Sequence, residues 1–361
     1  MALNQVGLER LNTATTDKIG ERKNKIINGG MLVNQRGNQS SVTTSVYGLD
    51  RFKVQEAAAV TYDINQSTDT PDGFGNSFHI DIQGAQSSPA ASHFMQLMTA
   101  LEGFDVQDFA KGTSEAKQYA VSFYIKTNVT GNYALQITDD NGRSCSKLYT
   151  VSDANWNRYT VIFPADTTGA IDNDNTEGLR LTWHLVVGTD RTSGTMNTTW
   201  AATTTANIAA GQNANVASST SNNWYITGVQ LEVGSVATDF EHRSLGEELL
   251  LCKRYFNMVN GGAESAAIYG IAYSGSNCHI IFNYPVEMRA PASAYLVNGT
   301  NYWAYIRYSS TVDGFDTLTQ NVSSDRNHME LMGSGNLSNG GYAGIIRPNN
   351  SSARLGFDAE L

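Results

Sequence analysis

The chain has 361 residues, enough for two or three domains of ordinary size. Only 16% of the residues are charged, and Gly is frequent (33) whereas Pro is rare (6), a composition typical of many short strands joined by polar turns. The formal net charge of −10 argues against nucleic-acid binding through a basic surface. We therefore expect an all-β protein.

The sequence also indicates in which cellular compartment the protein is assembled. It contains no run of about 18 apolar residues, and its first residues lack the apolar core of a secretory signal peptide, so we expect neither membrane insertion nor export. The three cysteines, Cys145, Cys252 and Cys278, are far apart and form no CxxC pair. Free thiols favour assembly in a reducing cytoplasm.

Residues 1–25 form a segment of their own. Leu3, Val6 and Leu11 are sparse apolar positions among polar ones, and an isolated helix of this length would be marginal. We expect a short helical or extended arm that a partner orders or that packs between identical subunits, and we assign these three residues to assembly contacts. The basic stretch at 18–25 indicates a solvated or partner-docking segment.

Residues 26–243 are expected to form a jelly-roll β-sandwich. Residues 101–111 indicate a helical turn or loop, and residues 201–221 a long polar loop. Apolar and polar residues alternate in the rhythm of half-buried strands at 31–35, 78–82, 92–98, 118–126, 131–138, 145–151, 157–163, 178–187 and 223–231. Eight or nine strands at this spacing are typical of a sandwich or jelly roll.

A short helix and a second, smaller β-sandwich are predicted next. Ser244 and Glu247 have the spacing of a capping box, which predicts a connecting helix at 244–256. Leu249, Leu250 and Tyr255 are too apolar for a free linker, so we assign them to contacts between the sandwiches or between subunits. The C-terminal sandwich at 257–361 would contain strands at 266–273, 278–284, 294–298, 301–308, 327–332 and 342–347.

Catalytic motifs are absent from the sequence. None of the six histidines has a partner at i+2, i+3 or i+4 that would make a metal pair, and the GxSxG, GxxxxGK and HExxH patterns do not occur. Glycoside hydrolysis needs two converging carboxyl groups. No spacing marks such a pair among the candidates, which are Asp63, Asp81, Asp139, Asp140 and Glu232.

The acidic loop at 166–175 leaves two interpretations open. Counted from Asp172, an EF-hand would need Gly and Glu where Glu177 and Trp183 stand, so the EF-hand is excluded. A looser calcium site and an Asx-rich turn remain as alternatives, and we assign no metal ligand.

Aromatic residues carry the strongest binding signal. In the stretch 302–308, Trp303, Tyr305 and Arg307 would share one strand face, and Tyr302 and Tyr308 the other. Aromatic faces edged by polar groups suit sugars, and a guanidinium suits acidic glycans. The alternative is that one face is core and the other an intersubunit contact. We assign these five residues to a glycan site.

The sequence context predicts different roles for three other tryptophans. Trp156 and Trp183 lie in apolar strand contexts and are expected in the core. Trp200 lies in a polar context without an evident burial partner, so it is a further candidate for glycan contact.

Several stretches resemble a known group of proteins. Residues 27–37 (INGGMLVNQRG), 47–54, 111–135, 224–256 and 282–290 (FNYPVEMRA) resemble tail-fibre and other virion proteins of bacteriophages, especially phages of marine bacteria and cyanobacteria. The resemblance implies a carbohydrate-binding-module-like jelly roll followed by a fibre tip. It also implies a homotrimer, and it carries over no catalytic residue.

The resemblance further implies how such a protein works. Its N-terminus would attach to a phage tail or nozzle protein, and its β-domains would contact a host-surface polysaccharide during adsorption. The protein would belong to the virion tail after assembly in the host cytoplasm. A structural calcium would fall near 29–35 and 230–232, although those segments lack an early acidic ligand. The alternatives are a capsid-decorating or other structural virion protein and, second, a polysaccharide depolymerase.

Overall fold

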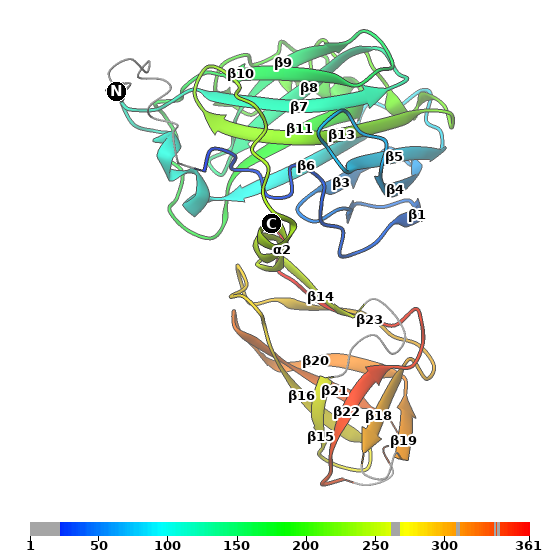
Figure 1. Cartoon of the computed structure of the whole chain (residues 1–361). Coiled ribbons are helices and arrows are strands. Elements are labelled where there is room, and N and C mark those ends of the chain that lie inside the picture. Colours follow the sequence, from blue (N-terminus) through cyan, green and yellow to red (C-terminus); the bar gives the residue numbers. More distant parts are fainter. Residues whose placement is uncertain (1–21, 261–267, 308–310, 336, 338–339) are drawn as a thin grey trace, which may run out of the picture.

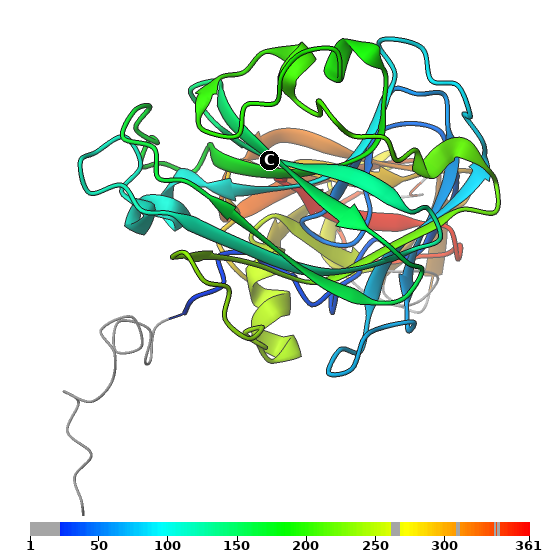
Figure 2. The ribbon, with the colours of Figure 1, turned by 90° about the horizontal axis from the view of Figure 1, so that it is seen from above.

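The computed structural model describes residues 22–260, 268–307, 311–335, 337 and 340–361. The described chain is almost entirely β-structure, and two sandwiches follow one another with a short helix, α2 (Leu245–Lys253), between them (Figure 1). We call the sandwich that precedes α2 the first sandwich and the one that follows it the distal sandwich. Viewed from above, the first sandwich lies in front of the distal sandwich (Figure 2). The all-β class and its sandwich architecture are confirmed.

The first sandwich packs two antiparallel sheets around one core. The six-stranded sheet has the order β1 (Gln39–Val42), β4 (Thr61–Ser67), β5 (Ser77–Gly84), β13 (Asn223–Val233), β7 (Tyr119–Thr127) and β10 (Asn157–Phe163). The seven-stranded sheet has the order β12 (Ala201–Ala202), β9 (Arg143–Val151), β8 (Gly131–Asp139), β11 (Glu177–Val187), β6 (Phe94–Glu102), β3 (Lys53–Glu56) and β2 (Val46–Tyr47).

Short 3-10 helices occur in the connections of this sandwich. They are η2 (Gly103–Phe109), η3 (Thr189–Arg191), η4 (Thr205–Asn207) and η5 (Val216–Ser218). The polar stretch expected at 201–221 is therefore not a plain loop, and Ala209, Val216 and Ala217 within it are fully buried.

Strand β13 shows how alternation decides which side chains meet the core. Trp224 and Ile226 are fully buried between the two sheets, whereas Tyr225 points to the other face of its sheet and stays partly exposed. The register places Tyr225 opposite His79 of β5 and opposite Lys126 of β7. Side chains from three neighbouring strands therefore meet on the outer face.

The first described residues lie against this sandwich. The strand predicted at 31–35 is wrong, because Asn28 and Met31 have φ values of 60° and 57° and the chain turns there. Gly29 lies close to β13: a Cβ at this position would be 2.1 Å from the carbonyl oxygen of Val229. Gly29 of the INGG motif therefore permits a close backbone contact with β13 that the Cβ of any other residue would block.

The capping signal before α2 is confirmed. The Ser244 hydroxyl accepts a hydrogen bond from the backbone N–H of Glu247 at 3.3 Å. The helix ends at Lys253, earlier than expected, and the chain continues directly into β14. Within the described residues, no helix is long and apolar enough to cross a membrane.

The distal sandwich has a three-stranded and a seven-stranded sheet. The smaller sheet has the order β14 (Phe256–Asn260), β23 (Arg354–Asp358) and β17 (Ser293–Val297). The larger has the order β19 (Thr311–Phe315), β18 (Trp303–Arg307), β22 (Ala343–Pro348), β15 (Ile268–Ala272), β16 (Asn277–Asn283), β21 (His328–Ser334) and β20 (Thr317–Ser324). Residues of both sheets contribute to a second apolar core.

Buried ion pairs join the two sandwiches. Arg51 of the first sandwich pairs with Glu360 of the distal one, and both side chains are only 2% exposed. Arg36 adds contacts to Asp358 at 3.1 Å and to Glu360 at 3.4 Å. Because unpaired buried charges are costly, these contacts favour one fixed relation between the sandwiches.

Candidate functional site

The outer face of the six-stranded sheet carries a cluster of aromatic and charged side chains. Its members, which we call the sheet-face cluster, are Asp69, His79, Lys126, Trp156 and Tyr225. The His79 and Tyr225 rings stack with centroids 4.1 Å apart and planes 2° apart. Trp156 meets Tyr225 edge-on at 6.1 Å, and the Lys126 ammonium lies 5.8 Å from the centre of the Tyr225 ring.

Asp69 holds two members of the cluster in place. Its carboxylate accepts a hydrogen bond from the Trp156 indole N–H at 2.9 Å and pairs with Lys126 Nζ at 2.6 Å. Partial burial opposes ionisation of Asp69, but these two hydrogen bonds outweigh it and keep the pKa of Asp69 below its ordinary value. Asp69 is therefore a carboxylate that orients the indole and the ammonium.

Polar side chains edge the aromatic rings. Asn223 Oδ1 lies 2.6 Å from His79 Nε2. In the next cross-strand row, Asp81 is opposite both Asn223 and Asp63. Burial, reinforced by the Asp69 and Asp81 carboxylates, raises the pKa of the Tyr225 phenol, so Tyr225 stays neutral. The face thus combines a ring surface with carboxylate and amide groups that can accept or donate hydrogen bonds.

The aromatic stretch at 302–308 is not such a face. Trp303 and Tyr305 are buried (1% and 0% exposed) in the distal core, so assigning them to glycan contact was wrong. Tyr302 also packs against that core, and Arg307 forms an ion pair with Asp313 at 3.2 Å. Alternation places Trp303 and Tyr305 on one face of the strand, but it does not show which faces the rest of the fold will cover. Tyr308 lies outside the described residues.

The predictions for two tryptophans of the first sandwich, Trp200 and Trp156, also need correction. Trp200 is only 8% exposed, because its indole N–H binds the carbonyl oxygen of Pro164 at 2.9 Å and its ring packs against Lys111. It is therefore not an exposed glycan contact. Trp156, which we expected in the core, is only half-buried and belongs to the sheet-face cluster, whereas Trp183 is fully buried as predicted.

The residues assigned to assembly differ in their surroundings. Tyr255 is 1% exposed, and its ring packs under the Arg51 guanidinium at 3.4 Å, so it is a contact within the chain at the junction of the sandwiches. Leu250 is 53% exposed and Leu249 is half-buried. Leu3, Val6 and Leu11 lie outside the described residues.

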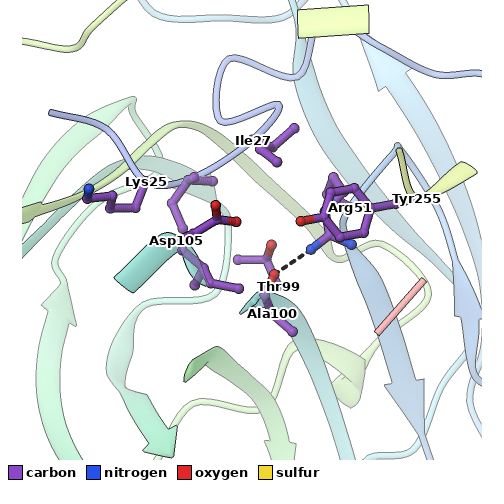
Figure 3. A pocket seen from close by; sticks show the side chains of 9 residues that line it. Lys25, Ile27, Arg51, Thr99, Ala100, Asp105 and Tyr255 are labelled. Atoms are coloured by element: carbon purple, nitrogen blue, oxygen red, sulfur yellow. Dashed lines mark hydrogen bonds between the residues drawn. The ribbon is translucent and has the colours of Figure 1, made fainter. Parts of the chain in front are cut away.

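A narrow crevice that has no room for a water molecule lies at the same junction (Figure 3). Arg51, Tyr255, Thr99 and Ala100 line it together with Asp105 and other residues. The Arg51 guanidinium is already engaged by the carbonyl oxygen of Ala100 and by Glu360. We therefore interpret this crevice as part of the packing between the sandwiches.

Carboxylate and carbonyl oxygens of the acidic loop and of Asp139 converge on the ammonium group of Lys111. Lys111 Nζ lies against Asp139, 3.0 Å from Asp166 Oδ2, and donates to the carbonyl oxygens of Gly169 (2.8 Å) and Thr168 (3.2 Å). Carboxylates and carbonyls are the ligands of Ca²⁺. Here they surround a tethered ammonium.

The rest of the acidic loop forms turns. Asp174 Oδ1 accepts from the backbone N–H of Thr176 at 2.8 Å, as the Asx-turn interpretation requires. Within the described ranges, no group of three or more His, Cys, Asp or Glu side chains is placed to hold a metal ion.

Comparison with known proteins finds likeness only among solved structures. No family model and no curated protein matches the chain. The chain is similar to the enzymatically active domain of tailspike protein 4 of bacteriophage CBA120 (10% identity, 58% of this chain and 21% of that chain, TM-score 0.32). It is also similar to a TmCBM61 structure in complex with β-1,4-galactotriose (10% identity, 59% and 100%, TM-score 0.30).

A third similar structure is the family 11 carbohydrate-binding module of the cellulosomal cellulase Lic26A-Cel5E of Clostridium thermocellum (11% identity, 56% and 100%, TM-score 0.28). At these identities and TM-scores, the likeness carries no inference about what this chain binds. The functional argument therefore depends on its own residues.

The sheet-face cluster was missed in the sequence because its members are far apart. His79 and Tyr225 are 146 positions apart, and their contact depends on the pairing of β5 with β13. One local signal was present: Tyr225 alternates with the apolar residues Trp224 and Ile226, which indicates an aromatic side chain on the outer face.

Proposed function

We propose that this protein is a non-enzymatic phage virion component that binds a host-surface glycan through the sheet-face cluster. In this proposal it is a tail fibre, a homotrimer attached to a tail or nozzle protein through residues 1–25. The observation that carries glycan binding is the stack of Tyr225 on His79 beside Trp156, bordered by amide and carboxylate groups. Ring faces pack on the C–H faces of sugars while polar neighbours bind hydroxyl groups.

The charges around the cluster favour a neutral glycan. Asp63, Asp69 and Asp81 lie on or beside this face, and Asp69 neutralises Lys126. An acidic polysaccharide would be repelled by these carboxylates, whereas neutral hydroxyl groups can donate hydrogen bonds to them. The Arg that had suggested an acidic glycan, Arg307, is paired within the distal sandwich.

The binding test is affinity electrophoresis in gels that contain purified surface polysaccharide of the host. Tyr225→Ala removes the central ring and should weaken retardation about tenfold or more, the equivalent of roughly 1.4 kcal/mol. The matched control is Phe104→Ala, because Phe104 is 51% exposed on η2 and belongs neither to the sheet-face cluster nor to the proposed subunit contact. If the two variants bind like the unaltered chain, the cluster is not the glycan site.

The trimer and its place in the virion are separate parts of the proposal. Exposed apolar side chains on strands of the distal seven-stranded sheet, Tyr269, Ile271, Ile281 and Val312, support contact with other subunits. Sedimentation should give three times the monomer mass, and a monomer would contradict the trimer. Gold labelling should mark the tail vertex of virions, whereas labelling over the whole capsid would favour the decorating alternative.

Within the described residues, Asp63 and Asp81 are a candidate pair for the depolymerase alternative. Asp63 and Asp81 are direct cross-strand neighbours, so their Cβ atoms are roughly 5 Å apart. Retaining glycosidases place their two carboxyl groups at a similar separation. Incubation with host polysaccharide should release no new reducing ends. Release that is lost in Asp81→Asn would replace the binding proposal with an enzymatic one.

A further inference from the structure

Helix α2 exposes an apolar hollow on one of its faces. Glu247, Leu250, Leu251 and Arg254 are spaced by three or four residues and therefore share that face. The residues that line the hollow are Glu247, Leu250, Leu251, Arg254, Val286 and Glu287. Leu250 is 53% exposed, so the hollow presents uncovered apolar surface in the described part of the chain.

The described chain begins at the rim of this hollow. Arg22 forms ion pairs with Glu247, which lines the hollow, and with Glu241 at 3.4 Å. The Glu241 carboxylate also accepts the backbone N–H groups of Lys23 and Asn24, each at 2.8 Å. The described part of the basic stretch, from Arg22 onward, thus lies against acidic groups of its own chain, and these contacts fix where the preceding residues start.

The residues before Arg22 have the composition to cover such a surface. Ile19 is three positions away and can reach about 10 Å, whereas Leu250 is only one helical turn, about 5 Å, from Glu247. Tethering at Arg22 gives these residues an effective concentration of order millimolar at the hollow. Residues 3–19 contain five large apolar side chains, Leu3, Val6, Leu8, Leu11 and Ile19.

We propose that residues 3–19 of the same chain lie over this hollow, with apolar side chains packed on Leu250 and Leu251. The segment is neutral overall, because Glu9 and Asp17 balance Arg10 and Lys18. The rim contains Arg254 as well as Glu247 and Glu287, so the apolar contact and not the charge favours this occupant. The inference goes beyond glycan binding, and the sheet-face cluster takes no part in it. It concerns the chain before assembly, because a tail or nozzle protein that binds residues 1–25 would have to displace residues 3–19 from the hollow. A second copy of the chain and an external ligand are the competing occupants.

Hydrogen exchange of the full-length chain tests this proposal. In the unaltered protein, amides of residues 3–19 should exchange at least about tenfold more slowly than in a free peptide of the same sequence. Leu250→Asp should remove that protection, because it places a carboxylate in the apolar contact. The matched control, Leu245→Asp, changes a side chain of α2 that is 59% exposed and does not line the hollow.

Each possible occupant of the hollow predicts a different hydrogen-exchange result. Protection of residues 3–19 that is lost in Leu250→Asp but kept in Leu245→Asp, and that does not change on dilution, supports the proposal. Free-peptide exchange rates in the unaltered chain would overturn it, as would equal protection in both variants. Protection that disappears on dilution would overturn it in favour of a neighbouring copy. A circular dichroism spectrum like that of the unaltered chain confirms that each variant is folded.

Discussion

The Lys111 site gives the sharpest stability prediction. Lys111→Met removes the ammonium but keeps most of the side-chain volume, and it leaves Asp139 without its cation. The side chains of Lys111 and Asp139 are both 0% exposed. Breaking a buried pair in this way costs about 3–5 kcal/mol. Asp139 keeps hydrogen bonds from the backbone N–H groups of Asn141 (3.0 Å) and Arg143 (2.7 Å), so we expect the lower end, about 3 kcal/mol.

Urea unfolding followed by tryptophan fluorescence measures this loss. The two sandwiches can unfold separately, so the transition of the first sandwich must be analysed alone. A loss of about 3 kcal/mol should lower its midpoint by roughly 1 M or more. Lys117→Met is the control, because Lys117 is exposed and should change stability by less than about 0.5 kcal/mol.

A double variant separates charge from packing. Lys111→Met with Asp139→Asn removes both charges and should cost less than the two single variants added together. Equal stability of Lys111→Met and the unaltered chain would refute the reasoning, as would strict additivity in the double variant.

Acid provides an independent test of the same site. Partial burial opposes ionisation of Asp166, but hydrogen bonds from Arg143 and Lys111 outweigh it and lower the pKa of Asp166 to about 2. The unfolded value is about 3.9. The stabilisation from Asp166 is therefore present above about pH 4 and is lost as the pH falls toward 2. Asp166→Asn should flatten stability over this window, and an unchanged pH profile would contradict the assignment.

Two further predictions concern the junction and the thiols. Arg51→Met leaves the buried Glu360 with fewer cations, so calorimetry should show the two sandwiches unfolding at more widely separated temperatures than in the unaltered chain. An unchanged calorimetric profile would contradict a coupling role. Burial raises the pKa of Cys145 and Cys278 to about 11 and that of Cys252 well above its ordinary value. The native protein should therefore react with no thiol reagent at pH 8, and all three thiols should react in urea.

The sequence predicted the architecture because its strands alternate clearly. The strands expected at 118–126, 157–163 and 178–187 match β7, β10 and β11 to within one residue at each end. Strands β1 to β4 were not predicted, because residues 39–67 are rich in polar residues and show little alternation. The backbone also turns at Arg51 and Ala59, which have positive φ, so these strands are short. Ser244 and Glu247 were enough to place the start of α2.

The candidate site was harder to predict, for a physical reason. Periodicity separates the two faces of a strand, but it does not show which face another sheet will cover. Trp303 and Tyr305 were therefore assigned to the surface although they fill the distal core. Conversely, Tyr225, His79 and Trp156 meet only through strand pairing and a loop, which no local pattern encodes.

The most direct test of glycan binding uses the indole N–H resonances of the five tryptophans. Trp156 is the tryptophan whose indole N–H binds Asp69 within the sheet-face cluster, whereas Trp183, Trp224 and Trp303 are buried in the two cores. Titration with neutral oligosaccharides from the host surface should shift the Trp156 resonance saturably and leave the buried ones in place. An unshifted Trp156 resonance at saturating glycan would contradict binding at this face.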